Sequence, residues 1–181
     1  MAQRRYPVWA EMTEGTQHSE LVGDGDEPPE PDRSGAGVTI IIDDGIEDVD
    51  VDWLADHVRQ AIALLDRKVV AISIRVMQDS EMAAMHERFG DASETTDVLT
   101  FSYGEDAVEA DIGVSIDVAR RAAKERGHNP TAELLLYIVH GVLHCMGYDD
   151  HEPGAWAAMH AEENRILSAM GVGELFGEVK R

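Results

Sequence analysis

Hydrophobic and polar positions along the chain predict a mixture of strands and helices. Short β-branched or alternating runs are typical of strands and lie at 38–43, 69–76, 96–102 and 109–115. Apolar residues at three- and four-residue spacing, with capping residues around them, predict helices near 50–66, 79–88, 115–127, 130–145 and 153–170. The predicted fold class is α+β, with a small mixed four-stranded sheet packed with about five helices.

The helix predicted after Asn129 and Pro130 is the most apolar of the five. Asn129 suits the N-cap and Pro130 the first helical position. Its apolar positions predict a mostly buried helix, yet it carries His140 and His144. Residues four apart lie on one face of a helix, so both imidazoles can reach a single ion. The sequence therefore predicts a metal site at the end of a buried helix.

A cluster of further ligand types follows this helix. Gly147 breaks the helix, and Asp149, Asp150 and His151 come within four residues of it. Zinc accepts nitrogen and carboxylate ligands, and a catalytic site combines three protein ligands with a water molecule. The predicted catalytic group is this metal-bound water. A structural zinc site would recruit several cysteines, and the chain has only Cys145.

Gly141 bears on which reaction a metal at this site could catalyse. It stands where the metalloprotease pattern H-E-x-x-H has its general-base glutamate. Hydrolysis of peptides or small molecules is therefore the weakest of the metal-dependent alternatives.

Composition divides the chain into three parts. Residues 1–36 form an acidic Pro/Gly-rich segment that is predicted to be disordered. Trp9 and Met12 are its candidates for docking on the folded part, which the composition does not favour. Residues 37–172 form the predicted domain, and 173–181 a short C-terminal tail.

The net charge of −21 opposes binding to phosphate backbones unless basic residues gather on one face. Arg120, Arg121, Lys124 and Arg126 do gather on the helix predicted at 115–127. They form either a solvated surface or the contact for an anionic substrate. No apolar run is long enough to span a membrane, and no apolar stretch follows the basic pair near the start, so a cytoplasmic location is expected.

Three motifs together resemble the YbeY family of rRNA maturation factors. The segment His140-Gly-Val-Leu-His144-Cys-Met-Gly147-Tyr148-Asp149 is similar to the family signature H-G-x-L-H-L-x-G-Y-D-H. Thr96–Phe101 and Asp111–Ser115 resemble two further family strands, in the same order. This resemblance implies a metal-dependent endoribonuclease specific for single-stranded RNA, acting in 16S rRNA 3′-end maturation and in ribosome biogenesis or quality control. It also implies one Zn²⁺ per chain, with Ni²⁺ or another divalent metal possible, and rRNA and the small ribosomal subunit as partners, with no DNA or membrane partner.

The chain departs from the family pattern at two positions. Asp150 occupies the place of the family's third metal-binding histidine, and His151 lies one residue later. An alignment without gaps favours Asp150, while His151 stays open as the alternative. Gly90 stands where the family often has an arginine facing the RNA, with Arg88 the nearest substitute. This loss, with the acidic surface, motivates a second hypothesis: a ribosome-associated binding protein with a structural metal.

Overall fold

The computed structural model describes residues 7–9, 37–89, 96–104 and 106–173. Within these ranges the elements in chain order are β1 (Gly37–Ile42), α1 (Val51–Ala63), β2 (Val69–Met77), α2 (Asp79–Phe89), β3 (Val98–Ser102), β4 (Val108–Ser115), α3 (Ile116–Arg126), α4 (Pro130–Cys145) and α5 (Pro153–Ala169). The predicted α+β class, with a four-stranded mixed sheet and five helices, is confirmed.

The sheet has the order β1-β2-β4-β3, so that β4 lies inside the sheet although it follows β3 in the chain. β1 and β2 are parallel, as are β2 and β4, and their connections run through helices. β3 and β4 form an antiparallel hairpin in which Thr100 lies opposite Ile112. The inner strand β4 is buried along almost its whole length, as expected for a strand covered on both faces.

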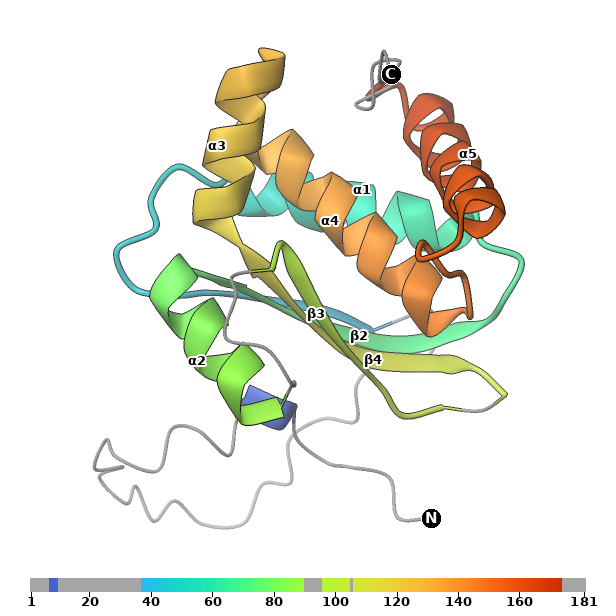
Figure 1. The fold of residues 1–181 in the computed structure, drawn as a ribbon, viewed down its shortest axis with the longest axis horizontal. Helices are drawn as coiled ribbons and strands as arrows, with labels where there is room; N and C mark the ends of the chain where they lie inside the picture. Colours follow the sequence, from blue (N-terminus) through green and yellow to red (C-terminus); the bar gives the residue numbers. More distant parts are fainter. Residues whose placement is uncertain (1–6, 10–36, 90–95, 105, 174–181) are drawn as a thin grey trace, which may run out of the picture.

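Helices α1, α3, α4 and α5 lie on one side of the sheet, with α4 across its centre (Figure 1). The helix begins where predicted, because the Asn129 side chain accepts a hydrogen bond from the Thr131 amide and Pro130 follows. Gly141 allows α4 to approach the sheet closely. A Cβ atom there would lie 3.0 Å from the methyl groups of Thr100 and Val98. Helix α4 therefore packs directly against β3 and β4 at this position.

Helix α2 and residues 7–9 cover the opposite side of the sheet (Figure 1). Val8 and Trp9 are buried there with Met77, Met82 and Met85. The amide of Val8 also donates a 2.6 Å hydrogen bond to the buried carboxylate of Asp111. Trp9 thus docks on the domain, which the composition of residues 1–36 had not favoured.

The predicted disorder of the N-terminal segment falls mostly on residues 10–36, and the predicted tail mostly on 174–181. Both stretches lie outside the described residues. None of the helices in the described ranges has the length and apolar character that a membrane crossing requires.

Candidate metal centre

The last two turns of α4 bring His140 and His144 together. Their ring centroids are 4.5 Å apart and the rings are nearly perpendicular, at 88°. The two Nε2 atoms lie 3.0 Å from each other. The one-face geometry expected from the four-residue spacing is therefore realised, with both rings half-buried.

Hydrogen bonds behind the rings set which nitrogen faces the cluster. The Nδ1 atom of His140 is 2.6 Å from the Glu163 carboxylate, and the Nδ1 atom of His144 is 3.1 Å from the carbonyl of Tyr148. Both partners are acceptors, so each Nδ1 carries the proton and donates it. Each Nε2 atom then presents a lone pair to the other. Two such nitrogen atoms at this distance must share either a proton or a cation. This is the tautomer that a metal-binding histidine needs.

The turn after α4 brings a third candidate donor to the two imidazoles. Gly147 has φ of +95°, a left-handed conformation that residues with a side chain rarely adopt, and it reverses the chain. Asp150 then lies with its carboxylate oxygens 3.7 Å from Nε2 of His140 and 3.9 Å from Nε2 of His144. One donor atom from each of these residues falls within 4.8 Å of the others.

His151 takes a different place. Its side chain is 84% exposed, and its Nδ1 atom lies 2.5 Å from the Asp149 carboxylate and 3.5 Å from that of Asp150. A second possible group, Asp149 with Asp150 and His151, is more exposed than the histidine pair. The geometry brings Asp150, rather than His151, to the two half-buried imidazoles, and its role as third ligand stays a prediction.

Glu163 on α5 is the residue of this site that the sequence reading missed. Its side chain is fully buried, with one oxygen bonded to His140 and the other, Oε2, lacking a hydrogen-bond partner among the described residues. A buried carboxylate without a fixed cation is costly. A divalent ion held by His140 would compensate this charge through the imidazole, so the cluster fits a bound cation.

The pKa of His140 reflects the same balance. Burial of the ring acts to lower its pKa, but the hydrogen bond to Glu163 and the charge of that carboxylate outweigh burial. The charges of Asp97 and Asp150 act in the same direction, so the pKa is raised above the ordinary value. The surroundings therefore favour positive charge at this imidazole, which is also what a bound cation would provide.

The predicted RNA-contacting residues lie on other elements and do not join this cluster. Arg120 of α3 is paired with Asp48 and Asp117, and Arg121 lies 2.7 Å from the Asp79 carboxylate. Lys124 is exposed on the same helix.

Arg88, at the end of α2, lies over the ring of Phe89, with its guanidinium carbon 5.2 Å from the ring centroid. On α3, by contrast, the arginines Arg120 and Arg121 are engaged with carboxylates. A role in binding substrate remains a prediction for all four residues.

Comparison with known proteins assigns the family. The family model described as endoribonuclease YbeY matches residues 42–171, which is more than half of the 181-residue chain. The chain belongs to the YbeY endoribonuclease family. The matched range contains all three donor residues and Glu163, and it excludes the N-terminal segment with Trp9.

Curated YbeY endoribonucleases agree with this assignment. The relative from Gluconobacter oxydans is 32% identical over 152 residues, covering 80% of this chain and 90% of the relative. That from Acidothermus cellulolyticus is 35% identical over 141 residues, with 67% and 84% covered. A solution structure from Thermotoga maritima has a TM-score of 0.51 at 18% identity, covering 80% of this chain and 99% of that one. This likeness supports the fold alone.

Proposed function

We propose that this chain is a metal-dependent endoribonuclease that cleaves single-stranded RNA. The observation that carries the proposal is the convergence of His140, His144 and Asp150, with both imidazole Nε2 atoms presented by hydrogen bonds behind them. A bound divalent ion would polarise a phosphoryl oxygen and lower the pKa of a coordinated water molecule. Membership of the YbeY family supports RNA as the substrate.

The protein groups have distinct proposed roles. His140 and His144 donate nitrogen ligands, Asp150 donates an oxygen ligand, and Glu163 holds the proton on Nδ1 of His140 so that Nε2 stays a ligand. Two imidazoles with one carboxylate suit Zn²⁺ and also admit Ni²⁺ or another divalent metal. We propose zinc, one ion per chain.

The finer biological role follows from the family resemblance. The proposed substrate is rRNA, with processing of the 16S rRNA 3′ end and ribosome biogenesis or quality control as the setting, and the small ribosomal subunit in the cytoplasm as partner. Arg88, Arg120, Arg121 and Lys124 are the proposed contacts to the RNA backbone. Arg120 and Arg121 would have to exchange carboxylate partners for phosphates.

The proposal is tested with His144→Ala, assayed on a fluorescent single-stranded oligoribonucleotide. Because one of three ligands is lost, bound zinc and RNA cleavage should both disappear, while circular dichroism and the thermal midpoint of the metal-free protein stay close to those of the wild type. His57→Ala is the matched control. It removes an imidazole from helix α1, where the ring stacks on Trp53, and should leave metal content and cleavage unchanged.

Cleavage that survives in metal-free His144→Ala protein would end the proposal. One observation favours a second candidate, a ribosome-binding protein with a structural metal: Arg120 and Arg121 are already paired with acids. That candidate predicts a wild-type protein that binds ribosomes and zinc but does not cleave. Peptide hydrolysis is disfavoured further by Gly141, because its environment leaves no room for a glutamate side chain.

A further inference from the structure

Helix α5, which supplies Glu163 to the candidate metal centre, carries a stacked aromatic pair of which Trp156 is the exposed member. Trp156 is 38% exposed, although large apolar side chains are usually covered. The ring of His160 stacks on its indole, with centroids 3.9 Å apart and an interplanar angle of 27°. The Nδ1 atom of His160 lies 3.1 Å from the Trp156 carbonyl, which fixes the imidazole ring against the helix. The pair therefore presents a flat surface of fixed orientation.

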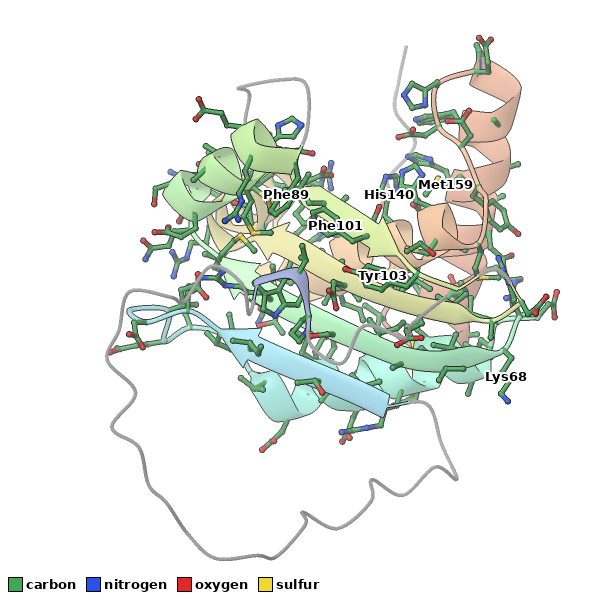
Figure 2. The ribbon with its side chains drawn as sticks, turned by 90° about the horizontal axis from the view of Figure 1, so that it is seen from below. Lys68, Phe89, Phe101, Tyr103, His140 and Met159 are labelled. Carbon is green, nitrogen blue, oxygen red and sulfur yellow. The ribbon has the colours of Figure 1, made fainter. Side chains whose placement is uncertain are left out.

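Two short contacts connect this pair to the ligand cluster. His160 lies 3.8 Å from one oxygen of Glu163, whose other oxygen is 2.6 Å from His140. Figure 2 shows α5 rising beside the labelled His140, with Met159 at the same level. Met159 is fully buried, so this turn of the helix is anchored to the domain. The side chain of His160 therefore lies between the exposed indole and Glu163, the residue that contacts His140.

The net charge of this protein opposes its binding to RNA, so the proposed contacts of basic residues to phosphates need support from contacts to the bases. The net charge is −21, and Arg120 and Arg121 are paired with carboxylates. Stacking of a base on an aromatic ring depends little on charge and tolerates any base, and proteins that bind single strands use it for this reason. An exposed tryptophan beside the centre is the kind of group such a protein needs.

We propose that the Trp156–His160 pair is a nucleobase-binding site, in which a base of single-stranded RNA stacks on the exposed indole. The site takes the base of a nucleotide near the phosphodiester held at the metal centre. The imidazole of His160 supports the indole from behind and keeps it in position. The identity of the ligand rests on the proposed endoribonuclease function.

The chain contains its own control for this site. Trp53 and His57 on α1 form the same arrangement, with ring centroids 3.8 Å apart, an interplanar angle of 24°, and Nδ1 of the histidine 2.8 Å from the tryptophan carbonyl. The local stack thus forms at both places in the described helices where a histidine follows a tryptophan by four residues. Trp53, however, lies in the first turn of α1, whereas α5 contacts the opposite end of α1 through Arg165 and the Leu64 carbonyl. Position beside the metal centre is what distinguishes Trp156.

Intrinsic fluorescence tests the proposal directly. The full-length protein, with metal removed by chelation so that RNA stays intact, is titrated with a short single-stranded oligoribonucleotide. Stacking should quench tryptophan fluorescence, and the quench should vanish in Trp156→Ala and persist in Trp53→Phe. Loss of one stacked base predicts a dissociation constant raised about 5- to 150-fold in Trp156→Ala. In the metal-loaded enzyme KM should rise similarly while kcat changes little, and Trp156→Phe should restore most of the affinity.

The outcomes separate this proposal from the proposed function. Trp156→Ala protein with wild-type fold, affinity and KM would overturn the stacking site while leaving endoribonuclease activity intact. Equal quenching by a blunt RNA duplex, whose bases are already stacked, would also overturn it. Conversely, wild-type protein that never cleaves RNA but shows a quench dependent on Trp156 would refute the endoribonuclease function and retain the stacking site.

Discussion

Two fully buried glutamates lie against opposite ends of helix α4, and they are bound in different ways. Glu133, in the first turn of α4, has partners for both oxygens: Arg126 at 2.9 Å and His128 at 3.0 Å. Glu163, which α5 places against the other end, has one partner at hydrogen-bond distance, His140. Its second oxygen has no hydrogen bond among the described residues.

The difference indicates what each end of the helix is built to do. At the first end the carboxylate is neutralised by an arginine that is always charged, so the arrangement is complete as it stands. At the second end the partner is an imidazole whose charge depends on a proton or on a bound cation. The first glutamate joins α3 to α4, whereas the second leaves charge to be compensated at the candidate metal centre.

The largest expected effect tests whether Asp150 or His151 is the third ligand of the candidate metal centre at the second end of α4. Asp150→Asn replaces the charged oxygen of the proposed third ligand by a neutral one. Since loss of an outer-shell partner already costs about 10- to 100-fold, zinc affinity should fall by about 100-fold or more. His151→Asn should leave the affinity unchanged, because that ring lies mainly in solvent against Asp149. Isothermal titration of metal-free protein measures both.

The reverse result, with affinity lost in His151→Asn and kept in Asp150→Asn, would show that the turn rearranges to bring the third histidine to the ion. A pair of equal losses would indicate that both residues bind. The fold of each variant is checked by its thermal midpoint, which should stay close to the wild-type value.

Exchanging each glutamate for glutamine breaks the comparison directly. Glu163→Gln can still accept a hydrogen bond from His140 but loses the charge, so zinc affinity should fall about 10-fold. Glu133→Gln puts an amide NH2 group in place of one of the two oxygens that Arg126 and His128 contact, and it removes the charge that pairs with Arg126, so the free energy of unfolding of metal-free protein should fall by about 1–3 kcal/mol. Each variant is the control for the other. Zinc affinity should be unchanged in Glu133→Gln, and Glu163→Gln should lose less stability than Glu133→Gln.

Equal effects of the two glutamines on zinc affinity would mean that the ends of α4 are coupled through the helix, contrary to the separate roles assigned to them. Urea unfolding monitored by circular dichroism and zinc titration by calorimetry, on the same samples, give the two quantities.

The convergence of His140 and His144 could be predicted from sequence because four-residue spacing on a helix is a local property. The strands and caps were predictable for the same reason: Asn129 and Ser115 cap the helices that follow them through contacts within three residues. For the third donor, the sequence left two candidates, Asp150 and His151. Its position depends on how the chain turns after Gly147, and helical periodicity does not determine that path.

Glu163 could not be distinguished by composition from Glu162, which pairs with Arg165 near the surface. The one available signal is its spacing, since Glu163 lies between Met159 and Ile166 on the buried face of α5. Trp9 was a candidate for docking that the composition did not favour, for a similar reason. Its partners Met77, Met82 and Met85 are distant in the chain, so only tertiary packing shows that the tryptophan docks.

The smallest expected effect concerns Gly141, where α4 approaches the sheet between its two ends. A Cβ atom there would meet methyl groups of Thr100 and Val98 at 3.0 Å and of Ile112 at 3.2 Å. Overpacking of this kind costs about 1–3 kcal/mol, while replacing a helical glycine by alanine contributes about 1 kcal/mol of stability. Gly141→Ala should therefore lower the free energy of unfolding by about 1 kcal/mol.

Gly154→Ala is the matched control, because it also lies in a helix but no described atom is within 4 Å of the added methyl group. It should leave stability unchanged or raise it slightly, by less than about 1 kcal/mol. If urea unfolding shows Gly141→Ala to be as stable as Gly154→Ala, helix α4 can move away from β3 without cost. The histidines one residue before and three after Gly141 would then owe their positions to Glu163 and the turn alone, and zinc affinity in Gly141→Ala measures whether that support is sufficient.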